Sequence, residues 1–215
     1  MSLRGNIETY TLEQKIEGYK LFSDTSYSYQ IRNRENMLVS FCQVSGSCSR
    51  EPVIFKPYYS SNEIQFKMET EFKLFSATHH LYCTTQNNFF AHIKSKIGGT
   101  WQIFFSSDRK PLNLVFSRDI KKRKVKAFNA DKMVDYLLIR EKKIVGGIIR
   151  DIQNEIKQNN DFKGNSRNNF DPTPCKLMLK LKPEVLKLDL RALWAATVVL
   201  QESYKIAPSP AVHFV

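Results

Sequence analysis

One stretch near the end of the sequence decides the fold, and it reads Leu190-Arg191-Ala192-Leu193-Trp194-Ala195-Ala196-Thr197-Val198-Val199-Leu200. After Arg191 only Thr197 is polar, so a helix here has no face suited to water. A membrane span needs about 20 apolar residues, and Arg191 and Gln201 bound this run at roughly half that length. We therefore predict a short helix, capped by Asp189, that is buried in the middle of a soluble protein with a sheet wrapped around it.

The composition favours a folded, basic globule. The chain has 215 residues, enough for one large β-domain or two small domains, and 42% of them are hydrophobic. Its net charge of +12 indicates a polyanionic partner, either nucleic acid or an anionic membrane surface.

The cysteines and the first residues bear on the compartment. Cys42, Cys48, Cys83 and Cys175 lie far apart, and the first six residues lack the apolar core of a secretory signal. We therefore expect free thiols in a reducing compartment. This predicts a cytoplasmic protein, peripheral at membranes or nuclear.

The first 18 residues are polar and leave two interpretations open. Thr11 and Gln14 have capping-box spacing and Gly18 would stop a short helix. The alternative is a flexible lead-in.

From residue 19 onward the sequence is mainly β-prone, with short runs separated by turn residues. The predicted strands are 19–22, 26–31, 37–43, 54–59, 63–68, 72–76, 80–85, 89–97, 100–105, 112–116, 133–139, 143–149 and 175–182. Residues 148–158 also have helical spacing at Ile148, Ile152 and Ile156, so a helix there stays open. We expect a mobile loop over 159–174, one domain over 19–204 and a tail over 205–215.

The strand over 89–97 is the most informative, because side chains alternate across a sheet. One face suits a core, with Phe89, Ala91, Ile93, Ser95 and Ile97. The other face carries a basic row, with Phe90, His92, Lys94 and Lys96.

A second basic segment follows at 118–126, which is either a loop or the end of an edge strand with a basic outer face. It contains Arg118, Lys121, Lys122, Arg123, Lys124 and Lys126. A solvated surface is the plain interpretation of such runs. Two basic rows together with the net charge favour binding to phosphate, since each lysine or arginine adds about 1 kcal/mol at an anionic leaflet.

Catalytic and metal-binding motifs are not evident in the sequence. There is no phosphate-cradling glycine loop, nucleophile elbow or paired C-x-x-C motif. His79 and Cys83 share a strand face, but two ligands do not make a zinc site. Glu69 and Glu71 most simply balance nearby lysines. We expect no enzymatic activity, no metal and no cofactor.

With these residues placed, the chain resembles the tubby C-terminal-like superfamily, which includes tubby proteins, LURP-one-related proteins and phospholipid scramblases. The likeness lies in residues 91–100, which end in Gly99-Thr100, and in the hairpin, last strand and helix over 136–149, 176–181 and 189–201. It implies a closed antiparallel β-barrel of about 12 strands around a central hydrophobic helix.

The resemblance also implies a ligand. Two basic residues on the matching tubby strand help to bind phosphatidylinositol 4,5-bisphosphate, and the second falls on Lys94. The first falls on His92, a departure, because neutral imidazole is a weak phosphate partner near pH 7. Lys96 would compensate.

Our leading hypothesis is a monomeric, non-enzymatic barrel that binds anionic phospholipid, with phosphoinositide first among the headgroups. The expected binding residues are His92, Lys94, Lys96 and the 118–126 cluster. The alternative is a nucleic-acid-binding or nuclear regulatory protein that uses the same charges. Scramblase-like lipid handling is a third. No stacked-aromatic RNA motif is evident in the sequence.

Overall fold

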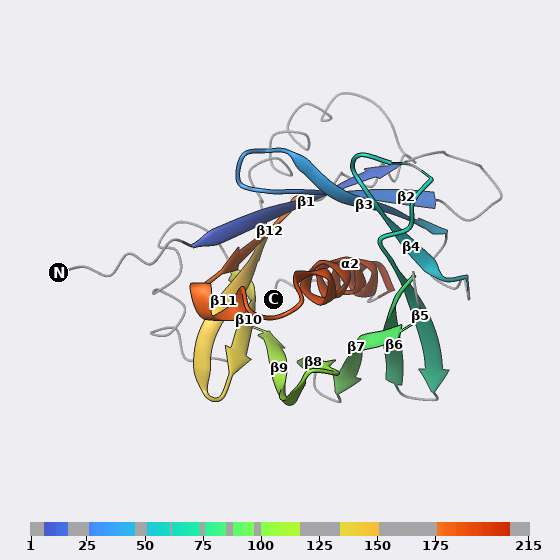
Figure 1. The fold of residues 1–215 in the computed structure, drawn as a ribbon. Coiled ribbons are helices and arrows are strands. Elements are labelled where there is room, and N and C mark those ends of the chain that lie inside the picture. Colours follow the sequence, from blue (N-terminus) through green and yellow to red (C-terminus); the bar gives the residue numbers. More distant parts are fainter. Residues whose placement is uncertain are drawn as a thin grey trace, which may run out of the picture.

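The computed structural model describes residues 7–16, 26–45, 51–60, 62–73, 76–84, 88–96, 100–116, 134–150 and 176–206. These residues form twelve strands, one 3-10 turn and one helix (Figure 1). The bounds are β1 (Glu8–Ile16), β2 (Ser26–Arg32), β3 (Leu38–Ser45), β4 (Val53–Pro57), β5 (Phe66–Lys73), β6 (Ser76–Cys83), β7 (Asn88–Lys96), β8 (Thr100–Phe105), β9 (Asp108–Phe116), β10 (Val134–Arg140), β11 (Lys143–Arg150), β12 (Lys176–Leu181), η3 (Pro183–Val185) and α2 (Leu190–Ile206).

The strands form one closed antiparallel barrel. Each pairs with its neighbours in chain order, and β1 pairs with both β2 and β12. Closure leaves no strand edge with unpaired backbone groups. The predicted barrel around a central helix is thus confirmed.

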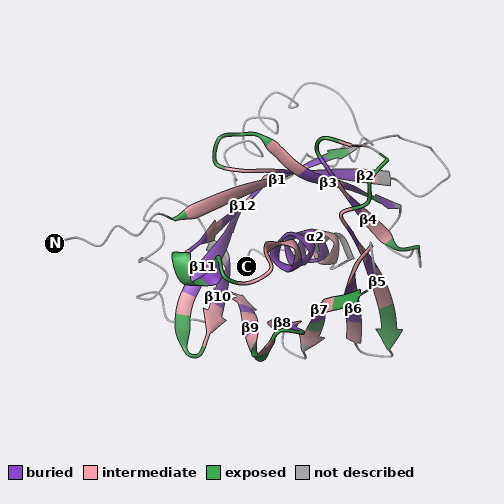
Figure 2. Cartoon of the chain, viewed as in Figure 1, coloured by how far each residue is buried: buried purple, intermediate pink, exposed green. Residues whose placement is uncertain are grey.

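The helix α2 lies inside this barrel, where Figure 2 shows it almost entirely buried. Val198 is 0% exposed and Trp194 is 9% exposed, with its ring in edge contact with Tyr10 at 5.6 Å between centroids. Asp189 Oδ1 accepts a hydrogen bond from the Arg191 backbone N–H at 3.1 Å, which confirms the predicted cap. The helix continues to Ile206, past the predicted end at Gln201 and into the segment expected to be a tail.

The strands supply the wall of this core through alternation. On β12 the leucines Leu177, Leu179 and Leu181 are buried, whereas Lys176 and Lys180 lie on the opposite face. Fully burying one such leucine stabilises the fold by about 1.5–3 kcal/mol. Among the described residues, no helix is both long enough and apolar enough to cross a bilayer.

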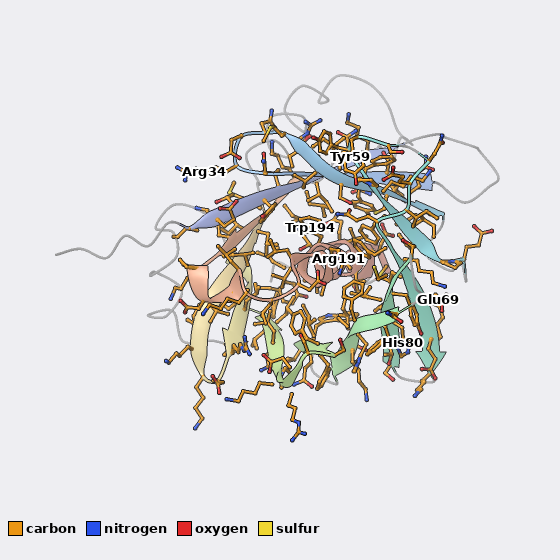
Figure 3. The ribbon with its side chains drawn as sticks, in the orientation of Figure 1. Arg34, Tyr59, Glu69, His80, Arg191 and Trp194 are labelled. Atoms are coloured by element: carbon orange, nitrogen blue, oxygen red, sulfur yellow. The ribbon has the colours of Figure 1, made fainter. Side chains whose placement is uncertain are left out.

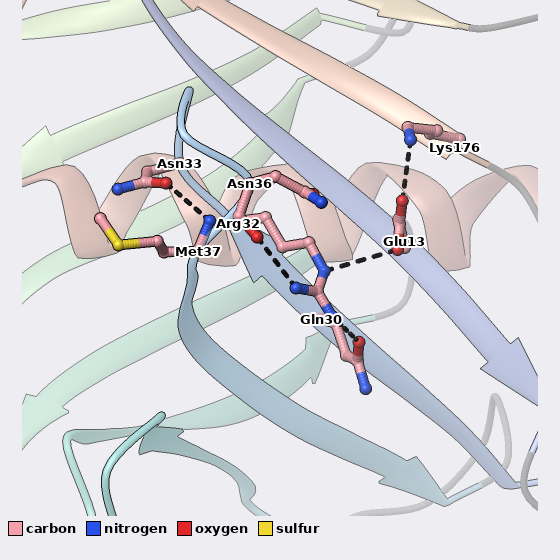
Figure 4. A network of polar contacts seen from close by, with 7 residues as sticks. All are labelled: Glu13, Gln30, Arg32, Asn33, Asn36, Met37 and Lys176. Carbon is pink, nitrogen blue, oxygen red and sulfur yellow. Dashed lines mark hydrogen bonds and ion pairs between the residues drawn. The ribbon is translucent and has the colours of Figure 1, made fainter.

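The first and last strands are joined by a polar network (Figure 4). Lys176 Nζ on β12 lies 2.8 Å from Glu13 Oε1 on β1, and Arg32 Nε on β2 lies 3.6 Å from Glu13 Oε2. The hydrogen bond from Lys176 lowers the pKa of Glu13. Charge pairing therefore reinforces the closure that the backbone ladder makes.

Several predicted elements differ from the structure. The short helix or lead-in over residues 1–18 is wrong for Glu8–Ile16, because Leu12 and Gln14 alternate inward on β1. A separate strand over 72–76 is wrong, because β5 runs to Lys73 and β6 starts at Ser76. β11 continues to Arg150, so no helix starts at Ile148. The predictions for 19–22, 118–126, 151–158 and 159–174 lie outside the described residues.

Candidate anion-binding face

Two of the predicted binding residues, His92 and Lys94, lie together on the outer face of β7. They are two residues apart on one strand, so both side chains point away from the core. Lys96 is the last residue of β7, and its side chain lies outside the described residues. The same is true of Arg118, Lys121, Lys122, Arg123, Lys124 and Lys126. The structure therefore tests the predicted arrangement only at His92 and Lys94.

Lys94 is the exposed cation of this face. It stands opposite Thr78 on β6 and Gln102 on β8. Gln102 Nε2 donates a hydrogen bond to Asn113 Oδ1 at 2.6 Å, which extends the polar row to β9. Within the described residues Lys94 has no carboxylate within ion-pair distance.

The lysines on β5 differ from Lys94, because each has an acidic partner. Lys67 Nζ lies 2.8 Å from Glu69 Oε1, and Lys73 Nζ lies 3.4 Å from Glu71 Oε1. Figure 3 labels Glu69 and His80 on the outside of the barrel at this edge of the face. Among the described lysine side chains of β5 and β7, only Lys94 therefore lacks a carboxylate within ion-pair distance.

His92 is held between two phenylalanine rings rather than turned to an anion. Its ring stacks on Phe104 at 4.7 Å between centroids and 15° between planes, and on Phe89 at 5.8 Å and 27°. Burial lowers the pKa of His92, and the charges of His80 and Lys94 lower it further. A neutral ring near pH 7 follows, so His92 adds little positive charge to this face.

A β-bulge on β7 changes the predicted pattern. Ala91 pairs with Leu81, but Phe89, two residues earlier, pairs with Tyr82, so the register shifts at this point. Phe89 turns outward and is 40% exposed, whereas the Phe90 ring packs against the core. The prediction that Phe89 faces the core and Phe90 faces outward is thus wrong.

The bulge completes a set of rings that the sequence analysis missed. Phe89 lies 6.0 Å from Tyr82 and 6.2 Å from His80, and His80 lies 6.1 Å from His92. These rings come from three strands, so no short sequence motif predicts that they lie together. We call Tyr82, Phe89, His80, His92 and Phe104 the ring platform.

The register of β7–β10 places the end of β9 and the start of β10 at the same end of the barrel as Lys96. Lys96 pairs with Thr100, and the next residue of β8, Trp101, pairs with Leu114. Phe116, the last residue of β9, therefore lies at the same end of the barrel as Lys96. Tyr136, near the start of β10, pairs with Phe116. The strands that flank the 118–126 cluster in the sequence, β9 and β10, thus meet at the barrel end where Lys96 lies.

The other residues weighed as chemical groups have structural partners. His79 is 9% exposed, its Nδ1 lies 2.9 Å from Thr70 Oγ1, and burial lowers its pKa to about 4. Cys83 Sγ lies 3.7 Å from Arg191 Nη1. Over the described residues, no three His, Cys, Asp or Glu side chains gather closely enough to hold a metal ion.

Comparison with family models, curated proteins and solved structures finds no match to this chain.

Proposed function

We propose that this barrel is a non-enzymatic module that binds anionic phospholipid headgroups, with phosphoinositides first among them. Lys94, Lys96 and the 118–126 cluster supply the cations. The contact is charge-assisted hydrogen bonding from lysine and arginine to phosphate oxygens.

The observation that carries the proposal is the position of Lys94. It is exposed and has no described acidic partner, unlike Lys67 and Lys73 on β5. It also lies two residues from Lys96, near the barrel end from which β9 leads into the cluster. Several cations near one barrel end would attract a multiply charged headgroup more strongly than one lysine alone.

The neutral state of His92 refines the proposal. Because His92 adds little charge near pH 7, Lys94 and the cluster have to carry the interaction. The resemblance to tubby-like barrels supports the choice of phosphoinositide over other anionic lipids.

Vesicle sedimentation with a panel of lipids tests the proposal. Phosphoinositide vesicles should bind the protein at moderate salt and neutral phosphatidylcholine vesicles should not. Lys94→Ala should weaken binding several-fold, and Lys122→Ala combined with Lys124→Ala should weaken it further. Lys143→Ala is the matched control, since this exposed lysine follows the β10–β11 turn, at the opposite end of β10 from Tyr136 and Phe116. Equal binding to neutral and phosphoinositide vesicles would reject the proposal.

A further inference from the structure

The ring platform is a continuous aromatic surface on the outside of a β-sheet. His80 pairs with His92, and His92 pairs with Phe104, so three rings cross β6, β7 and β8 in one row. Tyr82 pairs with Phe89, which adds a second row one step along the strands. The barrel core lies on the opposite face of these strands, so packing of the core does not require the platform.

The bulge on β7 gives the platform its most exposed ring. A regular strand would turn Phe89 into the core, whereas here it is 40% exposed and stacks on His92. Bulges commonly redirect a side chain near a functional site. Phe89 is exposed and the other four rings are half-buried, so a ligand can reach the platform from solvent.

Cations flank the platform. Lys94 lies next to His92 along the outer face of β7, and Lys67 Nζ lies 5.2 Å from the Tyr82 ring centroid. Glu69 and Glu71 stand on the β5 side, where each is paired with a lysine, and Glu71 Oε2 also lies 3.4 Å from His80 Nε2. A ligand with both planar rings and phosphates would therefore lie over β6–β8, with its phosphates near Lys94.

We propose that the ring platform binds unpaired bases of single-stranded nucleic acid at Phe89 and Phe104, the two ends of the stack that encloses His92, with Lys94 contacting the phosphate backbone. Every base has a π-face, so stacking on aromatic side chains of a sheet tolerates any sequence. Duplex bases are already stacked on each other and offer no free face. A membrane anchor is the weaker alternative, because His80 and His92 lie in the middle of their strands rather than at a protruding tip.

This inference goes beyond lipid binding, and the two ligands would share Lys94. Anionic vesicles and oligonucleotides should therefore compete for the protein. The rings should matter for the oligonucleotide alone.

Fluorescence anisotropy with a labelled oligothymidylate of twelve nucleotides tests the proposal. The second probe is an abasic strand of the same length, which keeps the phosphates and lacks the bases. The protein should bind the oligothymidylate more tightly than the abasic strand or a duplex. Phe89→Leu and Phe104→Leu should each weaken oligothymidylate binding by about tenfold and leave the abasic strand unaffected.

Two controls keep the result interpretable. Leucine preserves the apolar volume, and thermal unfolding checks that each variant is folded. Phe72→Leu is the matched substitution, since Phe72 is 57% exposed on β5 and lies outside the platform. It should bind as the wild type does.

Equal affinity for oligothymidylate and the abasic strand would overturn the proposal, as would unchanged binding by folded Phe89→Leu and Phe104→Leu. If folded Phe89→Leu and Phe104→Leu lost vesicle binding but kept oligothymidylate binding, the proposal would also be overturned, in favour of a membrane-docking surface. If vesicles fail to bind while oligothymidylate binds through the rings, only the lipid function fails.

Discussion

At the scale of single residues, the burial of His79 should make the stability of this barrel depend on pH. Burial lowers its pKa to about 4, below the value of about 6.5 expected in the unfolded chain. Between these values the unfolded state binds a proton that the folded state does not. Stability should therefore fall as the pH drops from about 6.5 toward 4, by on the order of 2–3 kcal/mol.

Urea unfolding at pH 7 and at pH 5 measures this loss for the wild type and for His79→Gln. The variant should lose less stability over the same interval, because it has no group to protonate. An identical loss in both proteins would assign the pH dependence to other groups.

Gly146 is a residue for which no side chain fits. A Cβ atom there would lie 2.7 Å from the Lys180 carbonyl oxygen and 3.2 Å from Leu181 Cδ2, on the neighbouring strand β12. Backbone cannot yield as a flexible side chain can, so Gly146→Ala should cost about 1–3 kcal/mol. An unchanged urea midpoint would show that β11 and β12 separate more easily than their spacing indicates.

Residue patterns predicted the site in part. Simple alternation placed His92 and Lys94 on one outer face, and both lie there. It failed at Phe89 and Phe90, because a bulge depends on the partner strand and leaves no mark in the local sequence. The ring platform stayed hidden for the same reason.

At the scale of elements, α2 is the core around which the strands close. Leu200 on α2 is 1% exposed, whereas Leu186, just after η3, is 38% exposed. Leu200→Ala should cost about 2–5 kcal/mol through lost contacts and the cavity left behind. The same substitution at Leu186 should cost under about 1 kcal/mol. Comparable losses in thermal unfolding would mean that α2 is not the packing centre.

The β10–β11 hairpin offers a stabilising change. Glu141 and Lys142 occupy its turn with φ of 48° and 68°, a left-handed conformation that glycine adopts without strain. Lys142→Gly should therefore raise stability by about 0.5–1 kcal/mol.

Lys143→Gly is the matched control for this turn, because Lys143 is already part of β11 and should lose stability on the same change. Chemical denaturation measures both. A gain at Lys143 or a loss at Lys142 would contradict the backbone argument.

Element patterns explain which strands the sequence revealed. An apolar helix too short for a membrane, with alternating strands around it, predicted a sheet wrapped around the helix. The closed barrel of about 12 strands was predicted from the resemblance to tubby-like proteins. β1 was missed because Thr11 and Gln14 have capping-box spacing, although Leu12 and Gln14 also alternate inward on the strand. Pairing with both β2 and β12 favours a strand over a helix here, and the local sequence does not show these partners.

For the whole molecule, we propose that part of the net charge of +12 serves phosphate binding on one face of the barrel. The ion pairs on β5 cancel locally, whereas Lys94 and Lys96 lie toward the barrel end where β9 ends at Phe116. We therefore propose that phosphate binds on β7–β8 and near that end.

Amide chemical shifts recorded by NMR during titration with the soluble headgroup inositol 1,4,5-trisphosphate test this placement most directly. We expect the largest changes at Lys94, Gln102 and Phe116, with smaller changes on β2 and β3. Shift changes centred on β2 and β3, or none at millimolar headgroup, would contradict the account.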